Sequence, residues 1–327
     1  MKTYSRILSA VHSTVWAIQP EKLQAILAFL ELKAAGQGPS EETLAQIQAA
    51  NIEAAKRASS VANASGSVAV IPVYGLISHR TSMMSEISGP GGTSCQQISK
   101  QVQAAANDPG VKAIVLDIDS PGGTVDGVAE LADEIYQARG KKQITAVSDC
   151  LMASAAYWIA AACNEIAVSP SSQTGSIGVY GAHEDYSGAL EQEGVKVTLI
   201  SAGKYKTEGN PYEPLNDDAR AAMQQTVDDY YGMFVKAVAK GRGVKADDVR
   251  NGFGEGRVVG ASQAVKLGMA DRVATLDQVL SKLGVNRNGN TSQMAAEQIV
   301  PIPLSQEDQE YLTHMENQRR RLALASL

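Results

Sequence analysis

Residues 111–123 read Val-Lys-Ala-Ile-Val-Leu-Asp-Ile-Asp-Ser-Pro-Gly-Gly, an apolar run that ends in a glycine turn. A short run of this kind is typical of a strand that is buried on both faces of a parallel sheet. The residues after the turn, from about 125 to 138, have the pattern of a helix. A buried strand, a tight turn and a helix together form the first part of a βαβ unit. The stretch therefore predicts an α/β fold.

Further strands and helices alternate on both sides of this stretch. Their short spacing favours βαβ units with right-handed crossovers. We expect strands at residues 68–75, 144–147, 165–168 and 195–200, and helices at 94–107, 153–162, 217–240 and 260–268.

Three segments differ in composition and in their expected secondary structure, which suggests a domain division. Residues 1–65 are expected to be a helical N-terminal extension, with one helix beginning near Pro20. Residues 66–285 carry the βα alternation and form the main domain. Residues 286–327 are expected to be a polar linker followed by a helix, from about 307 to 324, which is either solvated or docks a partner.

The composition excludes several classes of protein. The formal net charge is -6 without a long basic block, so a nucleic-acid surface is not indicated. The three cysteines have no C-x-x-C spacing, which indicates reduced thiols and no metal site. No run of about 18 apolar residues and no clean secretory signal is found, so we expect a cytoplasmic protein without a membrane anchor.

Ser154 lies among small residues, where an expected strand gives way to an expected helix. A serine hydroxyl becomes an effective nucleophile only when a base takes its proton. At the start of a helix it also lies beside unpaired amide donors and the positive end of the dipole, which favour a developing oxyanion. The alternative interpretation is a buried, alanine-rich helix with an incidental capping serine.

Gly122 and Gly123 end the opening stretch, between the buried strand and the next helix. Two glycines allow backbone conformations that other residues resist, and they let amides point at a ligand. The turn lacks the G-x-G-x-x-G pattern of dinucleotide-binding proteins, so a Rossmann fold has little support. A plain strand-to-helix turn is the alternative interpretation.

Lys204 and Lys206 follow the strand expected at 195–200, and each is a candidate general base. A lysine can act as a base where burial or nearby positive charge lowers its pKa. Most loop lysines are solvated. His183, with Asp185 as its partner, is the alternative base for a Ser–His–Asp triad, but the G-x-S-x-G pattern that marks such a nucleophile is absent.

Taken together, these motifs occur in the order found in the signal peptide peptidase A family of serine peptidases. The chain resembles this family over about residues 67–283, and it is most similar to the branch found in phage and prophage head modules. The segments that carry the resemblance are Ser120–Gly123, the helix with Ser154, Thr174–Gly178, Gly203–Pro211, and the closing passage 257–271.

The resemblance implies a ClpP/crotonase-like α/β fold, with the helical N-terminal and C-terminal extensions outside it, and peptide-bond hydrolysis by a Ser–Lys dyad. It implies Ser154 as the nucleophile, Lys206 as the general base and Gly122–Gly123 as the oxyanion-hole turn. Ser176 and Lys204 are implied as supporting neighbours, with Ser176 placed to hydrogen-bond the lysine amine. No cofactor or metal is implied.

The implied function is that of a serine endopeptidase that processes capsid or scaffold proteins during phage head maturation, in the cytoplasm or the prohead. Expected partners are a polypeptide substrate, portal, scaffold or capsid proteins, and further copies of the chain in a ring. Ala155-Ala156 stand where the family often has glycine, so we expect a narrower substrate channel. The missing membrane anchor favours capsid maturation over signal-peptide digestion.

Other functions stay open at this stage. The chain could be a catalytically inactive structural or scaffolding capsid protein on the same fold. It could also be a cytoplasmic peptidase that degrades signal peptides or other proteins. A crotonase-type acyl-CoA enzyme would use glycine-turn amides in the same way, although the Lys206 loop has no obvious role there.

Overall fold

The computed structural model describes residues 11, 14–34, 67–80 and 92–285 of the 327-residue chain. The centre of the fold is a five-stranded sheet in which every neighbouring pair is parallel, with the order β12-β9-β7-β5-β2. Its strands are β2 (Val68–Tyr74), β5 (Ala113–Asp119), β7 (Gln143–Ser148), β9 (Glu165–Val168) and β12 (Arg272–Val273).

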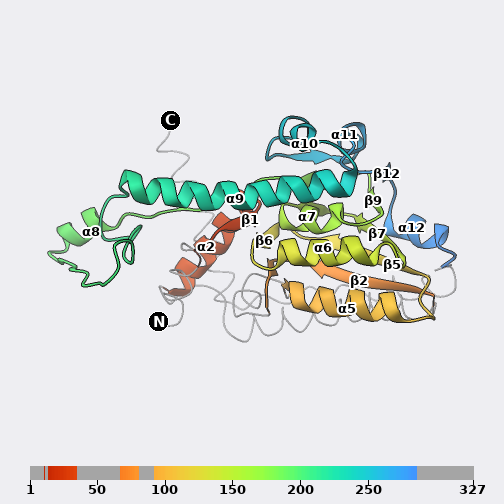
Figure 1. The fold of residues 1–327 in the computed structure, drawn as a ribbon, viewed down its shortest axis with the longest axis horizontal. Helices are drawn as coiled ribbons and strands as arrows, with labels where there is room; N and C mark the ends of the chain where they lie inside the picture. The colour runs from red at the N-terminus through yellow and green to blue at the C-terminus, as the bar shows by residue number, and fades with distance from the viewer. Residues whose placement is uncertain (1–10, 12–13, 35–66, 81–91, 286–327) are drawn as a thin grey trace, which may run out of the picture.

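Helices cover both faces of this sheet (Figure 1). Alternate residues of β5 belong to two separate apolar clusters, one of which includes Ile114 and Leu116 and the other Val115. Burial on both faces explains why β5 is an almost unbroken apolar run. The helices on the larger cluster are α5 (Cys95–Asn107), α6 (Val128–Ala138), α7 (Ala155–Ala161) and α9 (Asp217–Arg242), and α12 (Leu276–Lys282) covers the other face.

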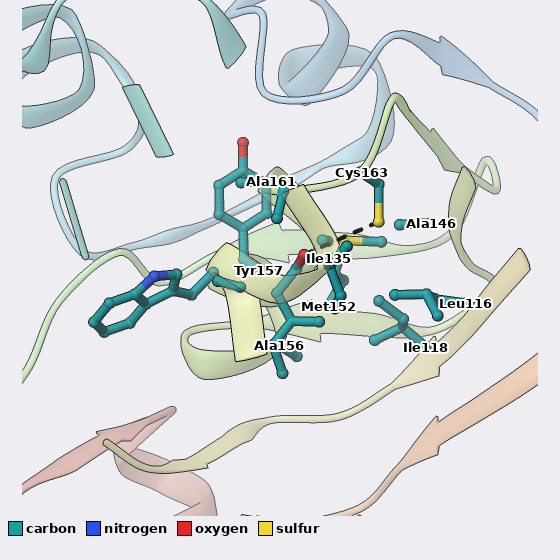
Figure 2. Packing of buried hydrophobic residues seen from close by; sticks show 14 of the residues in the cluster. Leu116, Ile118, Ile135, Ala146, Met152, Ala156, Tyr157, Ala161 and Cys163 are labelled. Atoms are coloured by element: carbon teal, nitrogen blue, oxygen red, sulfur yellow. Dashed lines mark hydrogen bonds between the residues drawn. The ribbon is translucent and has the colours of Figure 1, made fainter. Parts of the chain in front are cut away.

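Helix α7 is buried along its whole length. Its alanines allow close packing, and Figure 2 shows its side chains packed with Met152 and with Leu116 and Ile118 of the central sheet. The hydroxyl of Tyr157 points away from these residues and donates to the Met269 carbonyl at 2.9 Å. The core therefore fixes the orientation of α7.

Helix α9 packs directly on α7. The rings of Trp158 and Phe234 are stacked, with centroids 4.6 Å apart and planes 7° from parallel. Gly241 lies so close to the neighbouring helix that a Cβ there would be 1.8 Å from the carbonyl oxygen of Ala161. Only glycine allows this approach of the two backbones, so α7 is held between the sheet and α9.

Two smaller sheets lie beside the start of α7. The backbone of Ser120 joins them, because its N–H donates to Leu151 at 2.8 Å and its carbonyl accepts from Ala153 at 3.1 Å. One sheet consists of β8 (Leu151–Ala153), β10 (Gln173–Gly175) and β11 (Val258–Gly260), and the other of β1 (Trp16–Ile18), β6 (Gly122–Thr124), β3 (Ile77–Ser78) and β4 (Thr93–Ser94).

The N-terminal extension is only partly helical. Helix α2 (Pro20–Ala34) begins at the residue where the sequence predicts a helix start. The expectation of helix is wrong just before it, because Trp16–Ile18 form β1, antiparallel to β6. The proposed boundary near residue 65 and the predicted helix at 307–324 lie outside the described residues.

The strand expected at residues 195–200 is also absent, which corrects the sequence prediction. Its apolar residues have no neighbouring strand to pair with, and Ile200 is 96% exposed. This segment follows α8 (Ser187–Gln192) and lies at one end of the molecule, beyond α2 (Figure 1). The remaining helices are α10 (Ala246–Gly252) and α11 (Ala261–Lys266), where the sequence predicts a short helix near 260–268.

Candidate active site

Ser154 has an unusual backbone conformation at the junction of β8 and α7. Its φ of 54° and ψ of -118° are rarely adopted by residues other than glycine, and such strain is concentrated at functional sites. Two hydrogen bonds hold it, from Ser154 N–H to the Gly175 carbonyl (2.7 Å) and from Trp158 N–H to the Ser154 carbonyl (2.9 Å). A serine on a sharp strand-to-helix turn is the arrangement of a nucleophile elbow. The structure forms this turn without the G-x-S-x-G sequence that usually accompanies it.

The Ser154 side chain is enclosed by protein. The residue is 0% exposed, and its hydroxyl donates to the Gly178 carbonyl at 3.4 Å, which is long for an O–H···O bond. The next residue, Ala155, begins α7, so its amide has no partner within that helix. The hydroxyl and the Ala155 amide thus come from one rigid turn.

Gly122 lies beside Ser154, and the next residue, Gly123, has different surroundings. Gly122 has a φ of +100°, and a Cβ there would be 3.0 Å from Cβ of Ser154. Its amide donates to the Ser120 hydroxyl at 3.1 Å. A Cβ on Gly123 would be 1.7 Å from the Ile77 carbonyl oxygen, so only glycine fits between β6 and β3. The Gly122 amide is bonded within its own turn, whereas Gly123 faces the separate strand β1, so Gly123 is the better candidate for an oxyanion donor.

Ser176 is brought into the same region through its neighbour Gly175, whose carbonyl accepts from Ser154. Ser176 is buried and, like Ser154, has a φ of 54°. Its amide donates to the Arg257 carbonyl at 2.8 Å, which anchors this turn to the segment before β11. The positive φ of these two serines is not visible in the sequence.

Lys204 and Lys206 are not brought to Ser154. Both lysines are exposed, whereas Ser154 is fully buried, and the structure describes no hydrogen bond between either lysine and the serine. The Lys204 ammonium lies over the ring of its neighbour Tyr205, 4.6 Å from the centroid. Their segment belongs to the end of the molecule marked by α8, while α7 lies in its body (Figure 1).

The alternative nucleophiles and base are less suited. Burial raises the pKa of Cys163 and of Cys95 to about 12, and burial together with Asp119 raises the pKa of Cys150, so all three thiols are held protonated. The imidazole of His183, which precedes α8, lies 3.1 Å from the carbonyl of Asn210, which follows α8. It does not contact Ser154.

A cavity of about 450 Å³ lies next to Gly178, so it is one residue removed from the buried Ser154, which donates a hydrogen bond to Gly178. Gly178, whose carbonyl accepts from Ser154, forms part of its wall. The opposite wall includes Val227 and Tyr231 of α9, and Arg250, which lies over the Tyr231 ring at 5.0 Å. The cavity is large enough to take a side chain of a bound peptide.

The described residues show two further absences. They contain no group of three or more His, Cys, Asp or Glu side chains that could hold a metal ion. No helix among them has the length and apolar character needed to cross a membrane.

The chain is similar in sequence to known proteins. Over 235 residues, or 72% of its length, the chain is 36% identical to the head-tail preconnector protein GP5 of Enterobacteria phage P21. Over 206 residues, or 63% of its length, it is 37% identical to the capsid assembly protease C of Escherichia phage lambda. Each alignment covers 46% of the relative, so the chain spans about half the length of these curated proteins.

More distant relatives include Protease 4 of Salmonella typhi, which is 29% identical over 223 residues, or 68% of this chain and 35% of the relative. Residues 136–289 match the model of peptidase family S49. The α/β architecture agrees with the ClpP/crotonase-like fold expected for that family. The segment 136–289, which carries Ser154, Ser176 and both candidate lysines, therefore belongs to peptidase family S49.

Proposed function

We propose that the chain is a serine endopeptidase with Ser154 as its nucleophile, and that it processes proteins of a phage head. The observation that carries this proposal is the strained turn at Ser154, which two backbone hydrogen bonds hold beside Gly122 and the first amide of α7. The names of two relatives, a capsid assembly protease and a head-tail preconnector protein, support phage head proteins as substrates.

The proposed reaction is acyl transfer in two steps. The Ser154 hydroxyl adds to the peptide carbonyl as Lys206 accepts its proton, and the Gly123 and Ala155 amides donate to the oxyanion. Collapse of the intermediate breaks the C–N bond, and the leaving amine takes the proton from the lysine. Water, activated by the same lysine, then hydrolyses the acyl-enzyme.

We propose that Lys206 reaches Ser154 of a neighbouring copy in a homo-oligomer. Two observations support this arrangement. Within one copy, Lys206 is exposed whereas Ser154 is fully buried, so the two side chains are in different environments. The same segment exposes Val195, Leu199 and Ile200, which is costly for apolar side chains unless another surface covers them. Association of copies would cover this surface and would place the lysine in an enclosed site.

The catalytic claim is tested by co-expressing the chain with the capsid or scaffold protein of its own phage. Ser154→Ala should abolish cleavage, as measured by gel electrophoresis and mass spectrometry. Ser172→Ala is the matched control, because Ser172 is also buried but binds only the Ser169 carbonyl. Full cleavage by Ser154→Ala would refute the role of Ser154.

The arrangement of the dyad is tested by mixing inactive variants. Ser154→Ala and Lys206→Ala are each expected to be inactive alone. Co-assembly of the two should restore part of the activity, because some sites then combine an intact serine from one copy with an intact lysine from another. Absence of any restoration in confirmed hetero-oligomers would rule out a dyad shared between copies.

The separation of Lys206 from Ser154 also fits an inactive structural capsid protein on the same fold. The two functions differ in the reactivity of the serine. A fluorophosphonate probe should label Ser154 if the chain is a peptidase, and it should not label an inactive structural protein. For an inactive structural protein, heads should also assemble normally with the Ser154→Ala variant.

A further inference from the structure

The N-terminal strand β1 pairs with β6 on one side and with the chain at Tyr180 on the other. On one side, Trp16, Ala17 and Ile18 are opposite residues 124, 123 and 122 of β6 in antiparallel register. On the other side, Trp16 exchanges two backbone hydrogen bonds with Tyr180, at 2.9 and 3.0 Å. Strand β6 carries the glycine turn of the candidate active site, and Tyr180 follows Gly178 and Val179, which line its cavity.

The Ala17 carbonyl points towards the proposed oxyanion donor. In an antiparallel ladder, consecutive residues direct their N–H and C=O groups to opposite sides. Trp16 uses both groups on Tyr180, so Ala17 turns both of its groups to Gly123. In agreement, a Cβ on Gly122 would be 2.2 Å from the Ala17 oxygen and 3.0 Å from Cβ of Ser154. The Ala17 oxygen and the Ser154 Cβ are thus both close to the same point beside Gly122.

The side chains of β1 are anchored as those of a bound peptide would be. Trp16 and Ile18 lie in an apolar cluster with Leu23 and Leu30 of α2 and with Leu76. Ala17, between them, is fully buried on the opposite side, in the cluster that includes the residues of α7. Strand β1 therefore carries a small side chain on the face that joins the main core.

We propose that β1 occupies the position of a substrate strand, so that the chain blocks its own active site until β1 leaves. This inference rests on the proposed function of Ser154. The strand position takes an extended peptide, antiparallel to β6, with a small residue at the place of Ala17. A substrate peptide would replace the backbone hydrogen bonds of Trp16 and Ala17 one for one.

A reversible disulfide between β1 and β6 tests the proposal. Trp16 and Thr124 are opposite each other in a pair without ladder hydrogen bonds, where Cα atoms lie about 4.5 Å apart, within the range that a disulfide spans. The variant is Trp16→Cys with Thr124→Cys, in a Cys150→Ser background that removes the exposed native thiol. Each single substitution serves as a control.

The first readout is the rate at which a fluorophosphonate labels Ser154. In the oxidised double variant we expect labelling to fall at least about tenfold below that of the reduced form, because the fraction of open sites falls. Reduction should restore it. The Trp16→Cys single variant should react faster than the wild type, since β1 has lost its anchor. Equal rates in the oxidised and reduced forms would overturn the proposal.

The second readout does not need catalysis. A fluorescein-labelled peptide with the sequence of residues 11–19 is titrated into the double variant carrying Ser154→Ala, and its anisotropy is followed. Binding by the reduced but not the oxidised form supports an exchangeable strand position. Binding by neither form, or by both equally, refutes it. Selective peptide binding without labelling of any serine-containing form would instead refute the proposed peptidase function alone.

Discussion

Replacing Gly241 by alanine tests the contact that holds the nucleophile helix α7 against α9. The new Cβ would lie 1.8 Å from the Ala161 carbonyl oxygen and 2.7 Å from its carbonyl carbon, where real contacts stay above 3.0 Å. Both neighbouring atoms belong to the backbone, so no side-chain rotation can relieve the overlap. The two helices must separate.

The expected cost combines three effects. Overpacking of this kind costs about 1–3 kcal/mol. Separation of the helices also loosens the stacked rings of Trp158 and Phe234, and such a pair contributes about 0.5–1.5 kcal/mol. Removing a glycine from a helix offsets about 0.5–1 kcal/mol. We therefore expect Gly241→Ala to lower the free energy of unfolding by about 2 kcal/mol, within a range of about 0.5–4 kcal/mol, and the Tm by about 4–8 °C.

Thermal unfolding followed by circular dichroism measures this effect, and Gly232→Ala provides the matched control. Gly232 lies in the same helix, but a Cβ there would meet nothing within 4 Å, so alanine should stabilise the protein by about 0.5–1 kcal/mol. The labelling rate of the nucleophile should fall only in Gly241→Ala. If Gly241→Ala had a Tm equal to or higher than that of the wild type, the close contact between α7 and α9 would be refuted.

Three further predictions concern the site, the ion pair and the exposed segment. Gly123→Ala should lower the labelling rate of the nucleophile by about 10²-fold or more, because the clash with Ile77 forces β6 to shift and carries the amide of residue 123 out of position; an unchanged rate would contradict this role. Burial raises the pKa of Asp271, but hydrogen bonds, above all from the Arg242 side chain, lower it overall, so its stabilisation is present above about pH 4 and is lost as the pH falls through the depressed folded pKa. Urea midpoints at pH 7 and pH 3 should thus differ less in Asp271→Asn than in the wild type, and an equal difference would argue against the pair. Ile200→Asp should shift the protein to smaller species in sedimentation velocity, whereas Met233→Asp, at another exposed apolar residue, should not; oligomers that survive Ile200→Asp would exclude this segment as an interface.

The central sheet could be predicted because its strands are buried on both faces. Burial requires an apolar run such as that of β5, and local sequence alone records this. The start of α7 at Ser154 was also accessible, because small residues follow a strand-like run. Gly122 and Gly123 could be identified as a turn because they follow a buried apolar strand and precede a helix.

Other features depend on partners that are distant in the sequence. Strand β1 has three residues, and it exists because β6 and Tyr180 bind it from both sides. The positive φ of Ser154 is fixed by the Gly175 carbonyl, which local propensity does not encode. The expected strand at 195–200 fails because an alternating apolar pattern forms a strand only where a neighbour is available to pair with it.

If Ser154 is the nucleophile of a peptidase, a fluorophosphonate will form its covalent adduct on Ser154, and the site of that adduct can be mapped. The intact protein is labelled, digested and examined by tandem mass spectrometry, with Ser154→Ala and the buried control Ser172→Ala treated in parallel. We expect one adduct, on Ser154, which is lost in Ser154→Ala and kept in Ser172→Ala. An adduct on another residue, or labelling that persists in Ser154→Ala, would contradict this assignment.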